Sequence, residues 1–449
     1  MLTWEVRQKK HKAILALNWL KKLSIFSNHP KANKQLPKIK AFSALRPKPE
    51  LAQLVSSKSW DSNHNHISEA IMANYEHSYL HVVKPHLNFT DPERIPEKHY
   101  PFARQKFLDM KKLGVLVHDP SPCLYIYQVT DLRLGITYSG ITGLASVDDY
   151  LEGRIKVHEH TLSKKEAALV KHVEYVKAVG EPVLLTFEGG AWYDEFVKRI
   201  EQEAPLFSFT GDELVKTEVW PIRDTGDIAD IMAHMAELKA FYIADGHHRS
   251  AGAVRYCQKR REENPAYSGD EAYNYFLAYF IPTDKLKIFE FNRLVKKLAP
   301  LNANSFMDAI KERFHVKEIG HSMLQVKKKN HLFGMYMDHT WYGLDLKNEP
   351  QGNVLETLDV SILEKLVLKD ILNIQDSKSD ERLSFVDGTK GISRLQELVD
   401  IGEFEVAFSL FPTKIEEVIE VADQNLVMPP KSTWFEPKLR TGLLIYELE

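Results

Sequence analysis

The feature that most constrains the fold of this chain is an apolar run that ends at a polar turn containing glycine. Residues 240–244 read Ala-Phe-Tyr-Ile-Ala, a composition typical of a buried β-strand. The next residues are Asp245-Gly246-His247-His248-Arg249, and apolar residues then recur at helical spacing at Ala251, Val254 and Cys257. The pattern predicts a strand, a tight turn and a helix in direct succession.

This turn has the residues of an anion-binding site. The first backbone N–H groups of a helix lack intrahelical acceptors, and Gly246 would let a phosphate approach them closely. His247, His248 and Arg249 add side-chain donors, and the guanidinium is suited to a bidentate phosphate contact. Asp245 would either cap the helix or hold a magnesium ion. The alternative interpretation is an Asp N-cap followed by solvent-exposed histidine and arginine side chains.

A second polar motif is His158-Glu159-His160-Thr161, which precedes a predicted helix at Lys164–Val179. A carboxylate between two imidazoles suggests acid–base chemistry. Glu159, desolvated and held by a neighbouring histidine, would accept the proton of an attacking hydroxyl. The alternative is that Thr161 caps the helix and the histidines lie on the surface.

The third motif, near the C-terminal end, is Met428-Pro429-Pro430-Lys431-Ser432-Thr433-Trp434-Phe435-Glu436-Pro437-Lys438. Its prolines stiffen the loop, and Lys431, Ser432 and Thr433 are placed to reach a phosphate. Equally open is a rigid connector that packs Trp434 and Phe435.

A metal site is a further alternative for the histidine-rich motifs. His158 and His160, with Asp245 and either His247 or His248, would supply nitrogen and oxygen ligands for zinc or another divalent ion. The sequence has no HExxH motif or cysteine pair that would define the ligand geometry. The residues therefore leave open a metal-dependent hydrolase.

Length and composition limit the possible classes of protein. A chain of 449 residues predicts two or three packed units. The net charge of -3 provides no overall field that would attract nucleic acid or anionic lipid. Two cysteines cannot build a disulfide framework and fit a reducing compartment. No apolar run approaches the ~18 residues that cross a bilayer, so we expect a cytoplasmic protein with no membrane partner.

Helical and strand patterns alternate along the chain. Helical spacing in Glu50–Gly114 is followed by two strand patterns, and the remaining predicted elements continue this alternation. The predicted strands are Cys123–Val129, Ile136–Leu144, Val183–Phe187, Phe276–Pro282, Val406–Leu410 and Leu443–Tyr446; Ala303–Leu346 is expected to hold a helix and two strands joined by a turn at Lys327–Asn330, and Leu358–Leu372 an amphipathic helix.

The three motifs together resemble a bacterial and archaeal family long catalogued as a domain of unknown function. That family is marked by ADGHHR, HExT and PPKST, which stand here at Ala244–Arg249, His158–Thr161 and Pro429–Thr433. The resemblance runs from about Ile39 to the C-terminus. Its DGHHR turn is similar to the nucleotide-phosphate turn of the ParB/sulfiredoxin fold, and relatives that share this turn are kinases of free serine.

The resemblance implies an α+β fold with a ParB/sulfiredoxin-like mixed sheet core, flanking helices and a C-terminal α+β part. Residues 1–39 are then a basic, flexible extension and 40–120 a helical N-terminal part. The nucleotide-binding core would span 121–295, and 296–449 would form the C-terminal part with the PPKST loop. The extension belongs to a stretch, Val6–Pro49, with no Asp or Glu, which would also suit a targeting leader or a nucleic-acid arm.

For function, the resemblance implies transfer of a phosphoryl group from ATP or ADP to the hydroxyl of L-serine or a similar metabolite. Glu159, after His158, matches the catalytic glutamate of the serine kinases. The turn residues Gly246, His247, His248 and Arg249 would hold the donor phosphates together with Lys431, Ser432 and Thr433, and Asp245 would position Mg²⁺ or the acceptor.

At several positions this sequence differs from related families, and these differences bear on the expected activity and partners. His247 stands where sulfiredoxins have a cysteine, so the sequence does not support sulfinic-acid repair, and Cys257 lies too far along the helix to replace that cysteine. Histidines also replace the Glu-Arg-Arg of ParB clamps, so nucleic acid is not an expected partner. Lys58-Ser59-Trp60-Asp61 stands where the family usually has PPYD. A nucleotide-binding regulatory or DNA-associated module without catalysis remains the main alternative.

Overall fold

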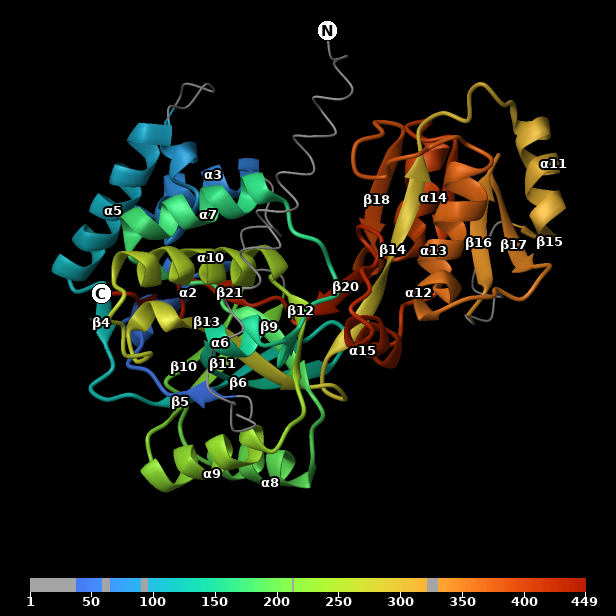
Figure 1. Ribbon diagram of the computed structural model, residues 1–449. Coiled ribbons are helices and arrows are strands. Elements are labelled where there is room, and N and C mark those ends of the chain that lie inside the picture. The colour runs from blue at the N-terminus through green and yellow to red at the C-terminus, as the bar shows by residue number, and fades with distance from the viewer. Residues whose placement is uncertain (1–37, 59–64, 90–95, 212–213, 321–329) are drawn as a thin grey trace, which may run out of the picture. The chain divides into compact units, whose positions relative to one another are not determined.

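Two large β-sheets with surrounding helices make up the described chain, and the predicted α+β class is confirmed. The computed structural model describes residues 38–58, 65–89, 96–211, 214–320 and 330–449 (Figure 1). Outside these residues lie most of the basic N-terminal extension, Ser59-Trp60-Asp61 of the KSWD segment and the lysines of the predicted 327–330 turn.

The first sheet is mixed, as expected for the core. Within the described residues it has nine strands, of which β13–β9 and β12–β7 are parallel pairs and the other neighbours antiparallel. The strand order is β10 (Phe207–Thr210), β11 (Val215–Ile222), β5 (Leu124–Asp131), β6 (Ile136–Ser146), β13 (Tyr275–Pro282), β9 (Val183–Phe187), β12 (Phe241–Asp245) and β7 (Ile155–Lys156), and β1 (Ile39–Lys40) also pairs with β6.

Burial on both faces explains why the central strands read as continuous apolar runs. Tyr125 and Tyr127 of β5 belong to one buried cluster, whereas Leu124 and Ile126 belong to another. Because successive side chains of a strand point to opposite faces, both faces of β5 are covered. The predicted strand Cys123–Val129 is thereby confirmed, one residue later in its start.

Helices lie on both sides of the first sheet. Figure 1 shows α7 (Ser163–Val176) beside α10 (His247–Glu263), with α8 (Ala191–Ile200) and α9 (Thr225–Ala236) across the strands from them. Helix α5 (Pro96–Lys112) packs on α7 and buries Ala103, Phe107 and Met110, as the helical spacing predicted within Glu50–Gly114 requires. Shorter N-terminal helices are α2 (Ala52–Val55), α3 (Asn65–Asn74) and α4 (Leu80–Val83).

Helix α7 ends earlier than its sequence pattern predicts. Lys177 adopts the left-handed conformation, with φ of 57°, and this terminates the helix. Ala178–Val179, expected to be helical, form strand β8 and pair with β22 (Tyr446–Glu447).

The second sheet is antiparallel throughout its described strands. Their order is β15 (Phe314–Gly320), β17 (Thr340–Leu346), β16 (Leu332–Met337), β19 (Val406–Ser409), β14 (Lys287–Val295) and β18 (Leu383–Asp387), with β20 (Thr433–Glu436) also paired to β14. Its helices are α11 (Ala303–Arg313), α12 (Val354–Thr357), α13 (Asp359–Leu363), the π-helical turn Glu364–Lys369, α14 (Ile392–Asp400) and α15 (Ile415–Asp423).

One local expectation for this second part was wrong. Ala303–Leu346 has a helix and three described strands rather than two, and β16 joins β17 at Asp338-His339, both with positive φ. Such a pair of left-handed residues matches the twist of a hairpin. The helix predicted at Leu358–Leu372 is confirmed over Asp359–Lys369, where α13 continues directly into the π-helical turn.

The last residues return from the second sheet to the first part of the fold. After β20, strand β21 (Arg440–Thr441) pairs with β3 (Ser57–Lys58), and β22 pairs with β8. Pro37–Glu449 accordingly form one compact unit. None of the helices in the described residues has the length and apolar character needed to span a membrane.

Candidate functional site

The predicted strand, turn and helix around Gly246 are confirmed. Strand β12 ends at Asp245, Gly246 adopts φ of 97° and ψ of 29°, and α10 begins at His247. A Cβ added at Gly246 would lie 2.9 Å from Nε of Arg249, so the position favours glycine for both conformation and space. No side chain caps α10, so Asp245 is not its N-cap. The first amides of α10 therefore retain the capacity to bind an anion.

Strand pairing brings the His158 motif beside this turn. Strand β7 runs parallel to β12, with Ile155 opposite Phe241, and both strands lead to the same edge of the sheet. The rings of His158 and His247 meet edge to face at 4.5 Å between centroids. Oε2 of Glu159 lies 3.7 Å from Nδ1 of His247. Two motifs that are distant in sequence thus form one cluster.

The inner histidines, His158 and His247, are buried and neutral. Their exposed fractions are 1% and 6%. Burial lowers the pKa of His158 to about 3 and that of His247 to about 4. The amide of His158 donates to Nε2 of His247 at 3.5 Å, whereas both ring nitrogens of His158 have no hydrogen-bond partner among the described residues.

The outer histidines, His160 and His248, have different surroundings. His160 is exposed, and half-buried His248 accepts a hydrogen bond from the amide of Leu162 at 3.4 Å. Leu162, rather than Thr161, occupies the N-cap of α7, and the Thr161 hydroxyl donates to Glu166. The capping role proposed for Thr161 is therefore not present.

The third motif joins the other two. The amide of Met428 donates to the carbonyl of His158 at 2.9 Å, and the rings of Phe435 and His158 lie 6.0 Å apart. Nζ of Lys438 lies 3.5 Å from Oδ2 of Asp245 and 4.5 Å from the centre of the Trp434 ring. All three motifs therefore meet around Asp245 and the start of α10.

Within this third motif, the candidate phosphate ligands differ in exposure. Lys431 is exposed, and its Nζ lies 5.1 Å from the centre of the Phe291 ring. Ser432 is buried and donates its hydroxyl to the carbonyl of Pro429 at 2.6 Å, while Thr433 is buried at the start of β20. Phosphate contacts by Lys431, Ser432 and Thr433 stay predictions.

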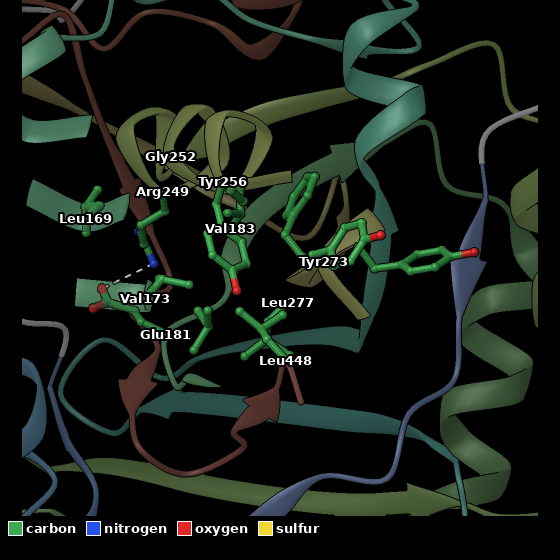
Figure 2. A pocket seen from close by; sticks show the side chains of 14 residues that line it. Leu169, Val173, Glu181, Val183, Arg249, Gly252, Tyr256, Tyr273, Leu277 and Leu448 are labelled. Atoms are coloured by element: carbon green, nitrogen blue, oxygen red, sulfur yellow. Dashed lines mark ion pairs between the residues drawn. The ribbon is translucent and has the colours of Figure 1, made fainter. Parts of the chain in front are cut away.

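Arg249 extends away from the turn into a mostly apolar cavity, where it pairs with Glu181 (Figure 2). Its guanidinium lies 3.0 Å from Asp245 and 3.2 Å from Glu181, and it donates to the carbonyl of Pro182. Although burial alone would raise the pKa of Asp245, the charges of Lys438 and Arg249 lower it to about 2. Arg249 therefore braces the turn; its predicted bidentate contact with phosphate stays a prediction.

Apolar side chains surround this ion pair. The cavity measures about 60 Å³ and lies between α7, α10, β9 and β13. Its walls include Leu169, Val173, Tyr256, Tyr273, Leu277 and Leu448. An apolar wall of this kind strengthens the attraction between Arg249 and Glu181 relative to the same pair in water.

Comparison with known proteins is consistent with the family inferred from the motifs. The model of a family described as "Protein of unknown function (DUF1015)" matches residues 39–361, more than half of the chain. The chain belongs to this family. No curated protein matches it.

Several solved structures align with about two thirds of this DUF1015 chain. A free serine kinase in complex with AMP is 17% identical, with 67% of this chain and 91% of that chain covered and a TM-score of 0.33. A conserved hypothetical protein from Pyrococcus furiosus is 15% identical (67% and 94% covered, TM-score 0.32). SbnI from Staphylococcus aureus, with a C-terminal truncation, is 11% identical (68% and 87% covered, TM-score 0.35).

Two charged residues of the site were not predicted. Lys438 ends the third motif, but the sequence pattern drew attention to Lys431, which precedes it. Glu181 lies in the short connection between β8 and β9 and has no motif of its own. Only its contact with Arg249 identifies it.

Proposed function

We propose that this DUF1015 protein transfers a phosphoryl group from ATP or ADP to the hydroxyl of free L-serine or a similar metabolite. The observation that carries the proposal is the meeting of an uncapped helix start, a lysine and a partly exposed carboxylate in one cluster. Phosphoryl transfer needs these three functions: anion binding, charge neutralisation and acceptance of a proton. The serine class of acceptor follows from the motif resemblance.

The donor phosphates would bind at the N-terminus of α10. The main-chain amides at Gly246, His247 and His248 supply donors there, and the helix dipole adds a positive potential. Because the inner histidines are neutral, the positive charge would come from other side chains, and lysines are candidates beside Arg249. Lys438 lies nearest the turn, and Lys431 is the second candidate.

Glu159 is the proposed general base. Nε2 of His247 accepts the His158 amide, so a neutral His247 carries its proton on Nδ1, the nitrogen that faces Glu159. This N–H would orient the carboxylate without neutralising it. The Glu159 side chain is 36% exposed, which leaves access for a hydroxyl group. The acceptor oxygen would bond to phosphorus as the bond to the departing nucleotide breaks, and its proton would pass to Glu159.

Asp245 suits a magnesium ion bound together with nucleotide. Mg²⁺ usually takes one or two protein carboxylates plus phosphate oxygens. Both ion pairs of Asp245 use Oδ2, and its low pKa keeps the carboxylate charged. When bound, the ion would offset the negative charge of the transferring group.

The direct test is formation of phosphoserine. Purified protein would be incubated with magnesium, L-serine and either ATP or ADP, and the product measured by mass spectrometry. Glu159→Gln and His248→Ala should abolish most of the product, whereas His160→Ala, an exposed histidine of the same motif, should retain it. Undiminished product in the first two variants would reject this site. Absence of product with either donor and a panel of hydroxy amino acids would reject the kinase.

A further inference from the structure

Three potential metal ligands converge in the buried part of the site. The ligand atoms of His158, Glu159 and His247 all lie within 4.8 Å of one another. Among the described residues this is the group of histidine, cysteine and acidic side chains with metal-binding spacing. His160, also considered from sequence, is exposed and does not belong to it.

The unpaired ring of His158 is a second, independent indication of a ligand. The exposed fraction of His158 is only 1%, and neither Nδ1 nor Nε2 has a hydrogen-bond partner within the described chain. Buried polar side-chain atoms nearly always have a partner. The ring packs against the rings of His247 and Phe435, and neither of these rings forms a hydrogen bond with a ring nitrogen of His158. A cation between the rings would engage one of these nitrogens directly.

We propose that His158, Glu159 and His247 bind a divalent transition metal ion. Two imidazole nitrogens with one carboxylate oxygen form a ligand set typical of zinc sites that keep a position open, whereas magnesium and calcium prefer oxygen ligands alone. In a tetrahedral zinc site, bonds of ~2.1 Å place ligand atoms ~3.4 Å apart. Small rotations of the three side chains, from separations of up to 4.8 Å, would close the site.

The local charges suit a cation at this position. Imidazole binds a metal ion in its neutral form, and Glu159 adds a carboxylate oxygen to the two ring nitrogens. The nearby cations Arg249 and Lys438 are paired with Asp245. Metal on Nδ1 of His247 would move the ring proton to Nε2, so the long 3.5 Å contact from the His158 amide would have to open.

Metal binding would have a defined consequence that rests on the proposed function. Coordination occupies the carboxylate of Glu159 and prevents it from accepting the proton of the substrate hydroxyl. A transition metal would therefore inhibit phosphoryl transfer, while magnesium, bound with nucleotide at Asp245, would support it. The metal site itself does not depend on catalysis.

The test is metal binding by the full-length protein after treatment with a chelator. Titration with Zn²⁺ should show one tight site that a thousandfold excess of Mg²⁺ does not displace. His158→Gln and His247→Gln should each weaken zinc affinity at least tenfold, and His160→Gln should leave it unchanged. No zinc binding by the wild type, or equal weakening by His160→Gln, would overturn the proposal.

A spectroscopic measurement on the wild type covers the case in which a variant fails to fold. Co²⁺ bound in place of zinc should give the visible absorption of a four- or five-coordinate ion, and X-ray absorption should detect two imidazole ligands. A spectrum without imidazole would overturn the site. Zinc binding without phosphoserine formation would leave the metal site and reject the kinase, whereas phosphoserine formation without zinc binding would do the reverse.

Discussion

The inner and outer histidines come from the same two motifs, yet their surroundings differ. His158 and His247 are buried and in contact with each other, whereas His160 is exposed and His248 half-buried. Adjacent residues of a helix point about 100° apart, which separates His247 from His248. His158 and His160 would share a face in a regular strand, but β7 ends at Lys156 before them. Each motif therefore contributes one buried histidine to the interior and one histidine to a more exposed position.

The largest expected effect separates two neighbouring residues of the His158–Thr161 motif. Glu159→Gln should lower kcat by ~10²- to 10⁴-fold, because the amide cannot accept the proton of the hydroxyl. His160→Ala, one residue away, should change kcat by less than about twofold, since exposed positions rarely affect the site. Rates of phosphoserine formation measure both. Equal losses in the two variants would remove the distinction between the inner and outer parts of this motif.

The next prediction concerns the glycine that directs the two histidines of the turn. Gly246→Ala should destabilise the fold by ~2–3 kcal/mol, because the left-handed conformation disfavours alanine and its Cβ would press on Arg249. Gly269→Ala is the matched control, with φ of 96° and open space around the added Cβ. Urea unfolding and nucleotide titration should show a smaller stability loss and normal nucleotide affinity for the control. A normal affinity in Gly246→Ala as well would contradict the anion site.

Stability against pH sharpens the comparison of burial. The pKa of folded His158 is lowered to about 3, while an unfolded histidine titrates near 6.5. As pH falls below 6.5, the unfolded chain gains a proton that the folded state excludes, so the free energy of unfolding falls. His158→Asn should reduce this fall by ~2 kcal/mol between pH 7 and 5. His160→Asn should leave the pH dependence of the unfolding free energy unchanged, as measured by urea unfolding. If His158→Asn also left it unchanged, His158 would titrate like a surface residue.

The smallest expected effect compares two lysines as the residue whose positive charge assists nucleotide binding at the Gly246 turn. Lys438→Met should weaken nucleotide binding by about 10-fold, because this lysine contacts Asp245 at the turn. Lys431→Met should have a smaller effect, since its amine lies over Phe291 and not beside Asp245. Calorimetric titration with ADP compares them. The opposite ranking would favour Lys431, the residue indicated by sequence.

Much of the local structure was predictable. The apolar run before Asp245, the following glycine and the helical spacing after it correctly predicted β12, the turn and α10, because neighbouring residues determine these features. The end of α7 at Lys177 was missed because a lysine rarely adopts the left-handed conformation. The hairpin at Asp338-His339 was missed because this pair lacks the glycine typical of a two-residue hairpin turn.

By itself, the sequence determined three polar motifs, their order and the family to which they belong. Only the tertiary structure decided that they meet, that His158 rather than His160 is buried, and that Arg249 pairs with Glu181. The physical reason is that contacts between distant segments follow from strand pairing and from the burial of apolar surface across the whole chain. No pattern within a single motif contains that information.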